Sequence, residues 1–191
     1  MRRWGWVLLI ATMVSTAYLG CSPSTDSGPT VTEYDRTTPD NLMKFFANAY
    51  REKELDDYEQ ALDEDFLFQF TSEIADELGL PPDEPWWGKT EDVSSTNGLF
   101  ESPTVTDITF TYEDVGAWEA VNEDRPDTTF SGLFRRFDPL IEVTTLVEEE
   151  DPIKKLRVDD SWIDVTVVPD RYTEGLWTIL KIQEIEKNPG S

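Results

Sequence analysis

Apolar side chains in residues 38–62 recur every three or four positions, the spacing that places them on one face of a helix. Thr38 is a good N-cap and Pro39 a good first residue, so the sequence predicts a helix that begins here. A second short helix is expected to follow. The residues expected to face inward on the two helices are Leu42, Phe45, Phe46 and Ala49, then Leu55, Tyr58, Ala61 and Leu62.

An alternation of period two comes next and predicts the first strand. Phe66, Phe68 and Phe70 alternate with other residues, so the three phenylalanines share one face. Two more helices are expected, each begun by a capping residue: Ser72 to Gly79, and Thr90 to about Phe100. The proline-rich stretch between them, which ends at Trp86-Trp87, predicts an irregular crossing.

Beyond residue 103 the chain is rich in β-branched and aromatic residues, which favours strands. The expected strands are 105–112, 133–137, 141–147, 162–168 and 177–185, with turns at 122–127, 138–139, 151–152 and 169–170. Helices followed by antiparallel strands predict an α+β fold, with N-terminal helices packed on a strongly curved antiparallel sheet. A lipocalin-like β-barrel is the alternative, but such a chain begins with strands.

The first twenty residues have a different composition from the rest. Arg2 and Arg3 precede an apolar stretch from Trp4 to Leu19, and no acid occurs before Asp26. The stretch is shorter than the ~20 residues that a membrane-spanning helix needs. This pattern predicts a secretory signal peptide over residues 1–20, and a short permanent anchor is the alternative.

The sole cysteine stands where the apolar stretch ends. Tyr18-Leu19-Gly20-Cys21 resembles the lipobox of bacterial lipoproteins, in which the leader is cut before the cysteine and its thiol receives a diacylglyceryl group. The resemblance implies an exported protein, anchored to a membrane of the cell envelope through Cys21, with its domain outside the cytoplasm. A free thiol after an ordinary signal peptide is the alternative.

Composition then divides the mature chain. Residues 21–37 hold the cysteine and a stretch rich in Ser, Thr, Pro, Gly and Asp, which predicts a flexible tether of ~20–24 Å. The folded domain is expected over residues 38–186, and residues 187–191 form a tail. Net charge is −24, so nucleic-acid binding through a basic surface is not expected. Histidine is absent, which excludes histidine bases and imidazole metal ligands, and neither a metal nor a cofactor is expected.

The helices and the first strand resemble the opening of the NTF2-like, or SnoaL-like, superfamily of cone-shaped domains. The resemblance rests on the segment from Phe45 to Tyr58, an amphipathic helix followed by a charged break and a Leu-Asp helix start, and on the acidic turn before Phe66. Steroid-isomerase-like members use a helix-one tyrosine and a first-strand aspartate, and these positions carry over to Phe46 and Phe70, which transfer no protons.

These observations predict a non-catalytic domain that binds a small apolar ligand or an envelope protein. The expected ligand-binding residues are Phe46, Tyr50, Phe68, Phe70, Trp86 and Trp87. The alternative is a cone-pocket enzyme, an isomerase or hydrolase that works with carboxylate and tyrosine. A shifted alignment supplies Tyr50 or Asp65 for that chemistry, and both are expected beside element ends where water reaches them.

Overall fold

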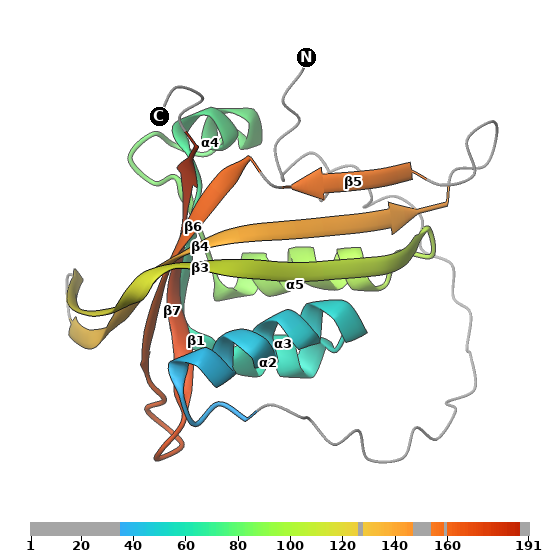
Figure 1. Ribbon diagram of the computed structural model, residues 1–191. Helices are drawn as coiled ribbons and strands as arrows, with labels where there is room; N and C mark the ends of the chain where they lie inside the picture. Colours follow the sequence, from blue (N-terminus) through green and yellow to red (C-terminus); the bar gives the residue numbers. More distant parts are fainter. Residues whose placement is uncertain (1–34, 126–127, 147–153, 159, 188–191) are drawn as a thin grey trace.

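The computed structural model describes residues 35–125, 128–146, 154–158 and 160–187, and Figure 1 shows their arrangement. Among the described residues, all four helices precede residue 101, and the elements that follow are strands. In chain order the elements are α2 (Pro39–Glu52), α3 (Leu55–Ala61), β1 (Leu62–Gln69), α4 (Ser72–Leu78), β2 (Trp86–Gly88), α5 (Lys89–Phe100), β3 (Val105–Arg125), β4 (Thr128–Thr145), β5 (Lys154–Val158), β6 (Ser161–Pro169) and β7 (Trp177–Glu186).

Local signals start and stop the helices much as the sequence predicts. The Thr38 hydroxyl accepts a hydrogen bond from the backbone N–H of Asn41 and so caps α2. Gly79 ends α4 in the left-handed conformation, where a side chain is disfavoured. Two predicted caps are wrong by one or two positions: Thr71 rather than Ser72 caps α4, and Gly88 takes the place expected for Thr90 at α5.

The strands form one seven-stranded sheet in the order β2-β1-β7-β6-β4-β3, with β5 paired to β4. Strands β1 and β7 pair parallel, and the other pairs are antiparallel. Helices α2, α3 and α5 pack on one face, where their apolar residues join those of the strands (Figure 1). The α+β prediction is therefore confirmed, and β2 and β3 remain as open edges, unlike in the β-barrel alternative.

The predicted turn at residues 138–139 is wrong, because β4 runs through it as one strand. Pro139 faces Tyr112 of β3. On its other side β4 pairs with β6 as far as Phe137 and with β5 from Ile141 onward, so its partner strand changes around Pro139. Proline has no backbone N–H and cannot donate a hydrogen bond to a neighbouring strand. It is tolerated at this position because neither β6 nor β5 pairs with it. Strand β3 is also longer than predicted, and β2 and β5 were not expected.

The three phenylalanines of the first strand lie in two clusters. Phe66 is fully buried in the main core between the helices and the sheet, whereas Phe70 packs with Ile74 and Ala75 of α4. Phe68 is half-buried and contacts both clusters. The predicted burial is thus correct for Phe66 and for Phe70, which directly follows β1, and α4 separates Phe70 from the main core.

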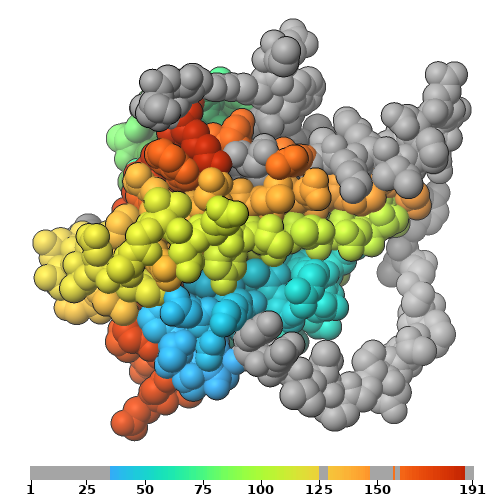
Figure 2. Space-filling model, viewed as in Figure 1, coloured from blue at the N-terminus to red at the C-terminus, as the bar shows by residue number. Residues whose placement is uncertain are grey.

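Part of the β3–β4 hairpin extends beyond the last pair between β4 and β6. We call residues 121–125 and 128–132 the β3–β4 arm, which projects from the body in Figures 1 and 2. Cys21 and residues 22–34 of the predicted tether lie outside the described residues, whereas residues 35–37 are described and Arg36 contacts the folded domain. Within the described part of the chain, no helix has the length and apolar character needed to cross a membrane.

Candidate functional site

The concave side of the sheet and the helices enclose a very small interior cavity, here called the cone cavity. Its volume is about 20 Å³, whereas a single water needs roughly 10–15 Å³ and ligand pockets usually measure about 300–1,000 Å³. Packed aromatic rings fill the space: the Tyr50 ring lies 5.1 Å from Tyr58 and 5.5 Å from Phe110. The lining residues are Phe46, Tyr50, Tyr58, Phe68, Phe110, Ile141, Ile163 and Ile182.

A carboxylate is buried beside these tyrosines. Asp92 on α5 is 7% exposed, and the Tyr58 hydroxyl donates a hydrogen bond to it. Thr96, one turn further along the helix, is also buried and hydrogen-bonds both Tyr50 and Tyr58. The cluster therefore joins α2, α3 and α5 by polar contacts inside an otherwise apolar core.

Burial controls the ionisation of this cluster. It raises the pKa of Asp92 to about 6, against which the hydrogen bond from Tyr58 acts. Burial and the Asp92 charge raise the pKa of Tyr50 to about 12 and that of Tyr58 well above its ordinary value. Asp92 thus titrates near neutral pH, while both tyrosines stay protonated and able to donate.

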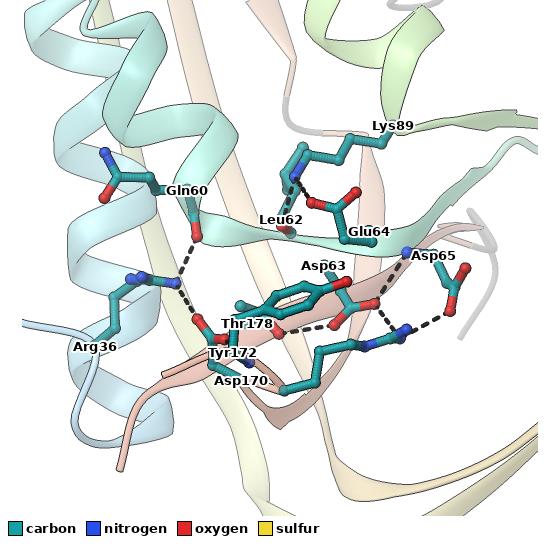
Figure 3. A network of polar contacts seen from close by, with 11 residues as sticks. Arg36, Gln60, Leu62, Asp63, Glu64, Asp65, Lys89, Asp170, Tyr172 and Thr178 are labelled. Atoms are coloured by element: carbon teal, nitrogen blue, oxygen red, sulfur yellow. Dashed lines mark hydrogen bonds and ion pairs between the residues drawn. The ribbon is translucent and has the colours of Figure 1, made fainter. Parts of the chain in front are cut away.

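A second, much larger hollow lies outside the core, and we call it the α3–β7 groove. Its volume is about 420 Å³, within the range of small-molecule sites. Helix α3, the start of β1 and the loop between β6 and β7 form its walls, and Figure 3 shows the polar side chains around it. The lining residues are Arg36, Asp56, Glu59, Gln60, Leu62, Asp63, Glu64, Lys89, Asp170, Tyr172 and Thr178.

The cations at the groove are already paired. Arg36 donates to the Asp170 carboxylate at 3.2 Å and to the Gln60 carbonyl at 2.6 Å (Figure 3). Lys89 donates to the Leu62 carbonyl at 3.1 Å and lies 3.6 Å from Glu64. Both cations of the lining are therefore engaged in contacts that join the walls of the groove to each other.

Of the other acids of the groove, Asp63 lies on β1 and pairs with Arg171, and the other two belong to α3. Asp56 and Glu59 are exposed, three residues apart and so on one helix face, and neither forms an ion pair with a described residue. Burial, and then the Asp56 charge, raise the pKa of the adjacent Asp57, which Arg36 counteracts. The α3 wall therefore carries uncompensated negative charge.

Tyr172 contributes an aromatic surface to the same groove. It is 76% exposed, the most exposed of the large apolar side chains in the described residues. Large apolar side chains are normally more buried than this, and an aromatic ring beside carboxylates is an arrangement that binds organic cations. The groove thus combines space, negative charge and a π face.

No protein-family model matches the chain, and no curated protein sequence is similar to it. Among solved structures, a conserved protein from Planctomyces limnophilus DSM 3776 superposes with a TM-score of 0.50 at 13% identity, covering 78% of this chain and 94% of that chain. An NTF2-like superfamily protein from Salmonella enterica serovar Typhimurium LT2 gives 0.48 at 7% identity, with coverages of 78% and 89%. A ketosteroid isomerase-like protein from Erwinia carotovora atroseptica gives 0.45 at 13%, with coverages of 78% and 94%.

The fold is NTF2-like. The predicted resemblance is thereby confirmed for the folded domain. A fold by itself assigns no activity.

The NTF2-like domain divides the six predicted ligand-binding residues between three places. Phe46, Tyr50 and Phe68 line the cone cavity. Phe70 and Trp87 instead pack against each other beside α4, with ring centroids 4.9 Å apart, because α4 covers that end of β1. Trp86 lies on β2 and is 38% exposed, outside both hollows.

The two groups named for proton transfer lie in different surroundings. Tyr50, two residues before the end of α2, is partly buried and lines the cone cavity against other aromatic rings. Asp65 is exposed on β1, as expected, and forms an ion pair with Arg171 at 2.8 Å. Within the described residues, no cluster of acidic or thiol side chains has the geometry of a metal site.

Sequence reasoning missed Asp92, the α3 acids and Tyr172. Asp92, Thr96 and Phe100 are spaced by four and share a face of α5, which was the available signal. A polar helix such as α5 does not reveal which of its faces is buried. The groove residues come from segments far apart in the sequence, so only the β1–β7 pairing and the β6–β7 loop bring them together.

Proposed function

We propose that this protein is a lipid-anchored lipoprotein of the cell envelope whose NTF2-like domain binds a small molecule without converting it, and that the α3–β7 groove is the binding site. The observation that carries the proposal is the contrast in space. The groove offers about 420 Å³ and the cone cavity about 20 Å³, so the apolar ligand expected inside the cone has no preformed space there.

The charges of the groove select the ligand class, a small organic cation with an ammonium or guanidinium group. Arg36 and Lys89 pair with Asp170 and Glu64, and neither forms an ion pair with Asp56 or Glu59 of α3. The acids of α3 supply the counter-charge and Tyr172 supplies a cation–π surface. A net charge of −24 also raises the local concentration of cations.

Calorimetric titration with spermidine and with tetramethylammonium tests the ligand class. We expect binding of at least one of these cations, weakening with salt, and no binding of acetate or of an uncharged isostere. The double variant Asp56→Asn/Glu59→Gln should lower affinity about fivefold, since each exposed ionic contact contributes about 0.2–1 kcal/mol.

A matched control is available on α4. Glu73 and Asp76 are also exposed, also three residues apart and on a helix of the same length, so Glu73→Gln/Asp76→Asn removes the same charge away from the groove. Equal loss in both double variants would show only a general charge effect. Binding of an apolar dye in preference to the cations would overturn the ligand class.

The anchor is proposed from the leader and the place of Cys21. One acyl chain holds a protein only marginally, so a diacylglyceryl group on this thiol would provide stable attachment. Incorporation of labelled palmitate is expected in the natural protein and not in Cys21→Ser, which should stay uncleaved or be released. A correctly cleaved Cys21→Ser protein that still fractionates with membranes would contradict the anchor.

A second candidate function is favoured by Asp92 and the two tyrosines, namely an isomerase or hydrolase working inside the cone. A carboxyl with a pKa of about 6 suits general acid–base chemistry near neutral pH. This function requires the aromatic core to open for a substrate. Turnover that is lost in both Asp92→Asn and Tyr58→Phe, while these variants keep their fold, would replace the binding proposal with this one.

A further inference from the structure

We propose that Arg171 is a positioning residue that couples the β3–β4 arm to the α3–β7 groove by fixing the loop of residues 170–176, which carries Tyr172. Arg171 does not line the groove, so it acts on a ligand only through its neighbour. The relevance to ligand binding rests on the proposed function, whereas the coupling between arm and loop does not.

One face of the coupling is an ion-pair cluster on β1. Arg171 Nη2 lies 2.7 Å from Asp63 Oδ1 and 2.8 Å from Asp65 Oδ2. Asp63 is only 3% exposed, and it also accepts hydrogen bonds from the Thr178 hydroxyl at 3.2 Å and from the Asp65 backbone N–H at 3.0 Å. A buried carboxylate with its partners so arranged cannot shift without cost, so it gives Arg171 a fixed point of attachment.

The other face of the coupling is the arm. The Arg171 guanidinium lies 5.1 Å from the centroid of the Phe130 ring, within the range of a cation–π contact. The arm approaches β6 closely at Gly132, where a Cβ atom would stand 2.2 Å from the Val167 carbonyl oxygen. An ion pair of 3.4 Å between Glu123 and Lys181 adds a second contact between the arm and β7.

The loop transmits this attachment to Tyr172. Asp170 Oδ1 accepts hydrogen bonds from the backbone N–H groups of Tyr172 and Thr173, at 2.8 and 3.0 Å, and Asp170 Oδ2 is held by Arg36. The loop is thus a closed turn attached at Arg36 on one side and at Arg171 on the other. Because the Tyr172 ring is itself largely exposed, the backbone attachments and not its own packing set its direction.

Hydrogen exchange measured by mass spectrometry on the full chain without ligand tests the coupling. Arg171→Lys removes the planar guanidinium and its shared contacts, and Phe130→Leu removes the π face but keeps an apolar side chain. We expect each to speed exchange of the amides of residues 171–176 about threefold, the effect of losing an exposed cation–π contact. Phe130→Tyr keeps the ring and should restore the natural rate.

Arg136→Lys is the matched control. Arg136 also pairs with a carboxylate, Asp164 at 2.6 Å, and stacks on an aromatic ring, Trp162 at 5.2 Å, but it does so on another part of the sheet. Exchange of residues 171–176 should not change in this variant. Unchanged exchange in both Arg171→Lys and Phe130→Leu, or equal change in Arg136→Lys, would overturn the coupling.

Titration with the organic cation that binds the natural protein separates this inference from the proposed function. Phe130→Leu should weaken binding about threefold although Phe130 lies outside the groove. Faster exchange with unchanged affinity would overturn the positioning role. If no cation binds the natural protein, the proposed function fails while the exchange data still decide the coupling.

Discussion

The cone cavity and the α3–β7 groove lie on opposite sides of the same helix, and they differ in almost every physical respect. The cavity is lined by aromatic and aliphatic side chains, and Asp92 is buried behind it against the Tyr58 hydroxyl. The groove is lined mainly by charged side chains, most of which are paired. Inside, the absence of water moves the pKa of Asp92 to about 6. In the groove, ion pairs hold the Arg36 and Lys89 side chains against its walls. The space between the walls, about 420 Å³, is therefore left for a ligand.

The comparison shows that a fold's usual pocket need not be the site with space. In this NTF2-like domain the side chains of the helices fill the concave side, and the open volume arises where α3, β1 and the β6–β7 loop meet. Changes to the two regions should therefore affect different properties: stability for the cavity, and binding for the groove.

The largest effect is expected for Phe66→Ala in the core next to the cavity. Phe66 is 1% exposed, so its truncation should lower the free energy of unfolding by about 3–5 kcal/mol. Denaturation by guanidinium chloride measures this, with Phe66→Leu as a milder control. A loss below about 1 kcal/mol would mean that the core relaxes around the site and is less tightly packed than described.

The next effect is a pH dependence caused by Asp92. Because its folded pKa is raised from 3.8 to about 6, the folded state holds the proton more tightly, and stability falls as pH rises between these values. The difference in unfolding free energy between the natural protein and Asp92→Asn should therefore drop by about 3 kcal/mol from pH 3.5 to 7. Asp76→Asn controls for the loss of one carboxylate, and a flat difference for Asp92→Asn would show that Asp92 titrates normally.

A smaller effect distinguishes two glycines. Gly132→Ala would place a Cβ atom 2.2 Å from a backbone oxygen beside the β3–β4 arm, and it should cost about 1–3 kcal/mol. Gly98→Ala, in α5 with nothing within 4 Å of the new atom, should instead stabilise by about 0.5–1 kcal/mol. Thermal unfolding of the two variants should therefore move in opposite directions; destabilisation of the same size in both would contradict the close approach.

The smallest stability effect is expected for Tyr172→Ala in the groove. The ring is 76% exposed, so the free energy of unfolding should change by less than about 0.5 kcal/mol. Affinity for an organic cation should nevertheless fall at least about twofold, because the π face is lost. Destabilisation above about 1 kcal/mol would identify Tyr172 as a packing residue and weaken the contrast between the two regions.

Local sequence signals predicted the helical half of the fold well. The spacing of Leu42, Phe45, Phe46 and Ala49 fixes the buried face of α2, and Thr38 caps it, because both depend on residues within one or two turns. The strands were predicted less accurately. In the sequence, Pro139 indicates a turn. In the structure it lies within β4, where the partner strand changes from β6 to β5, and that change depends on the tertiary structure.

What the sequence determined by itself was the α+β class, the order of the helices and the first strand, and the burial of Phe66 and Phe70, since periodicity and capping act over short distances. The leader and the place of Cys21 predict a lipid anchor, because both are local features of the sequence. Tertiary structure alone decided that the cone is filled, that Asp92 sits beside Tyr58, and that Asp56, Glu59 and Tyr172 face one groove. The volume of a cavity and the pKa of a buried carboxyl depend on how side chains far apart in the sequence pack together and exclude water. No local sequence pattern determines either quantity.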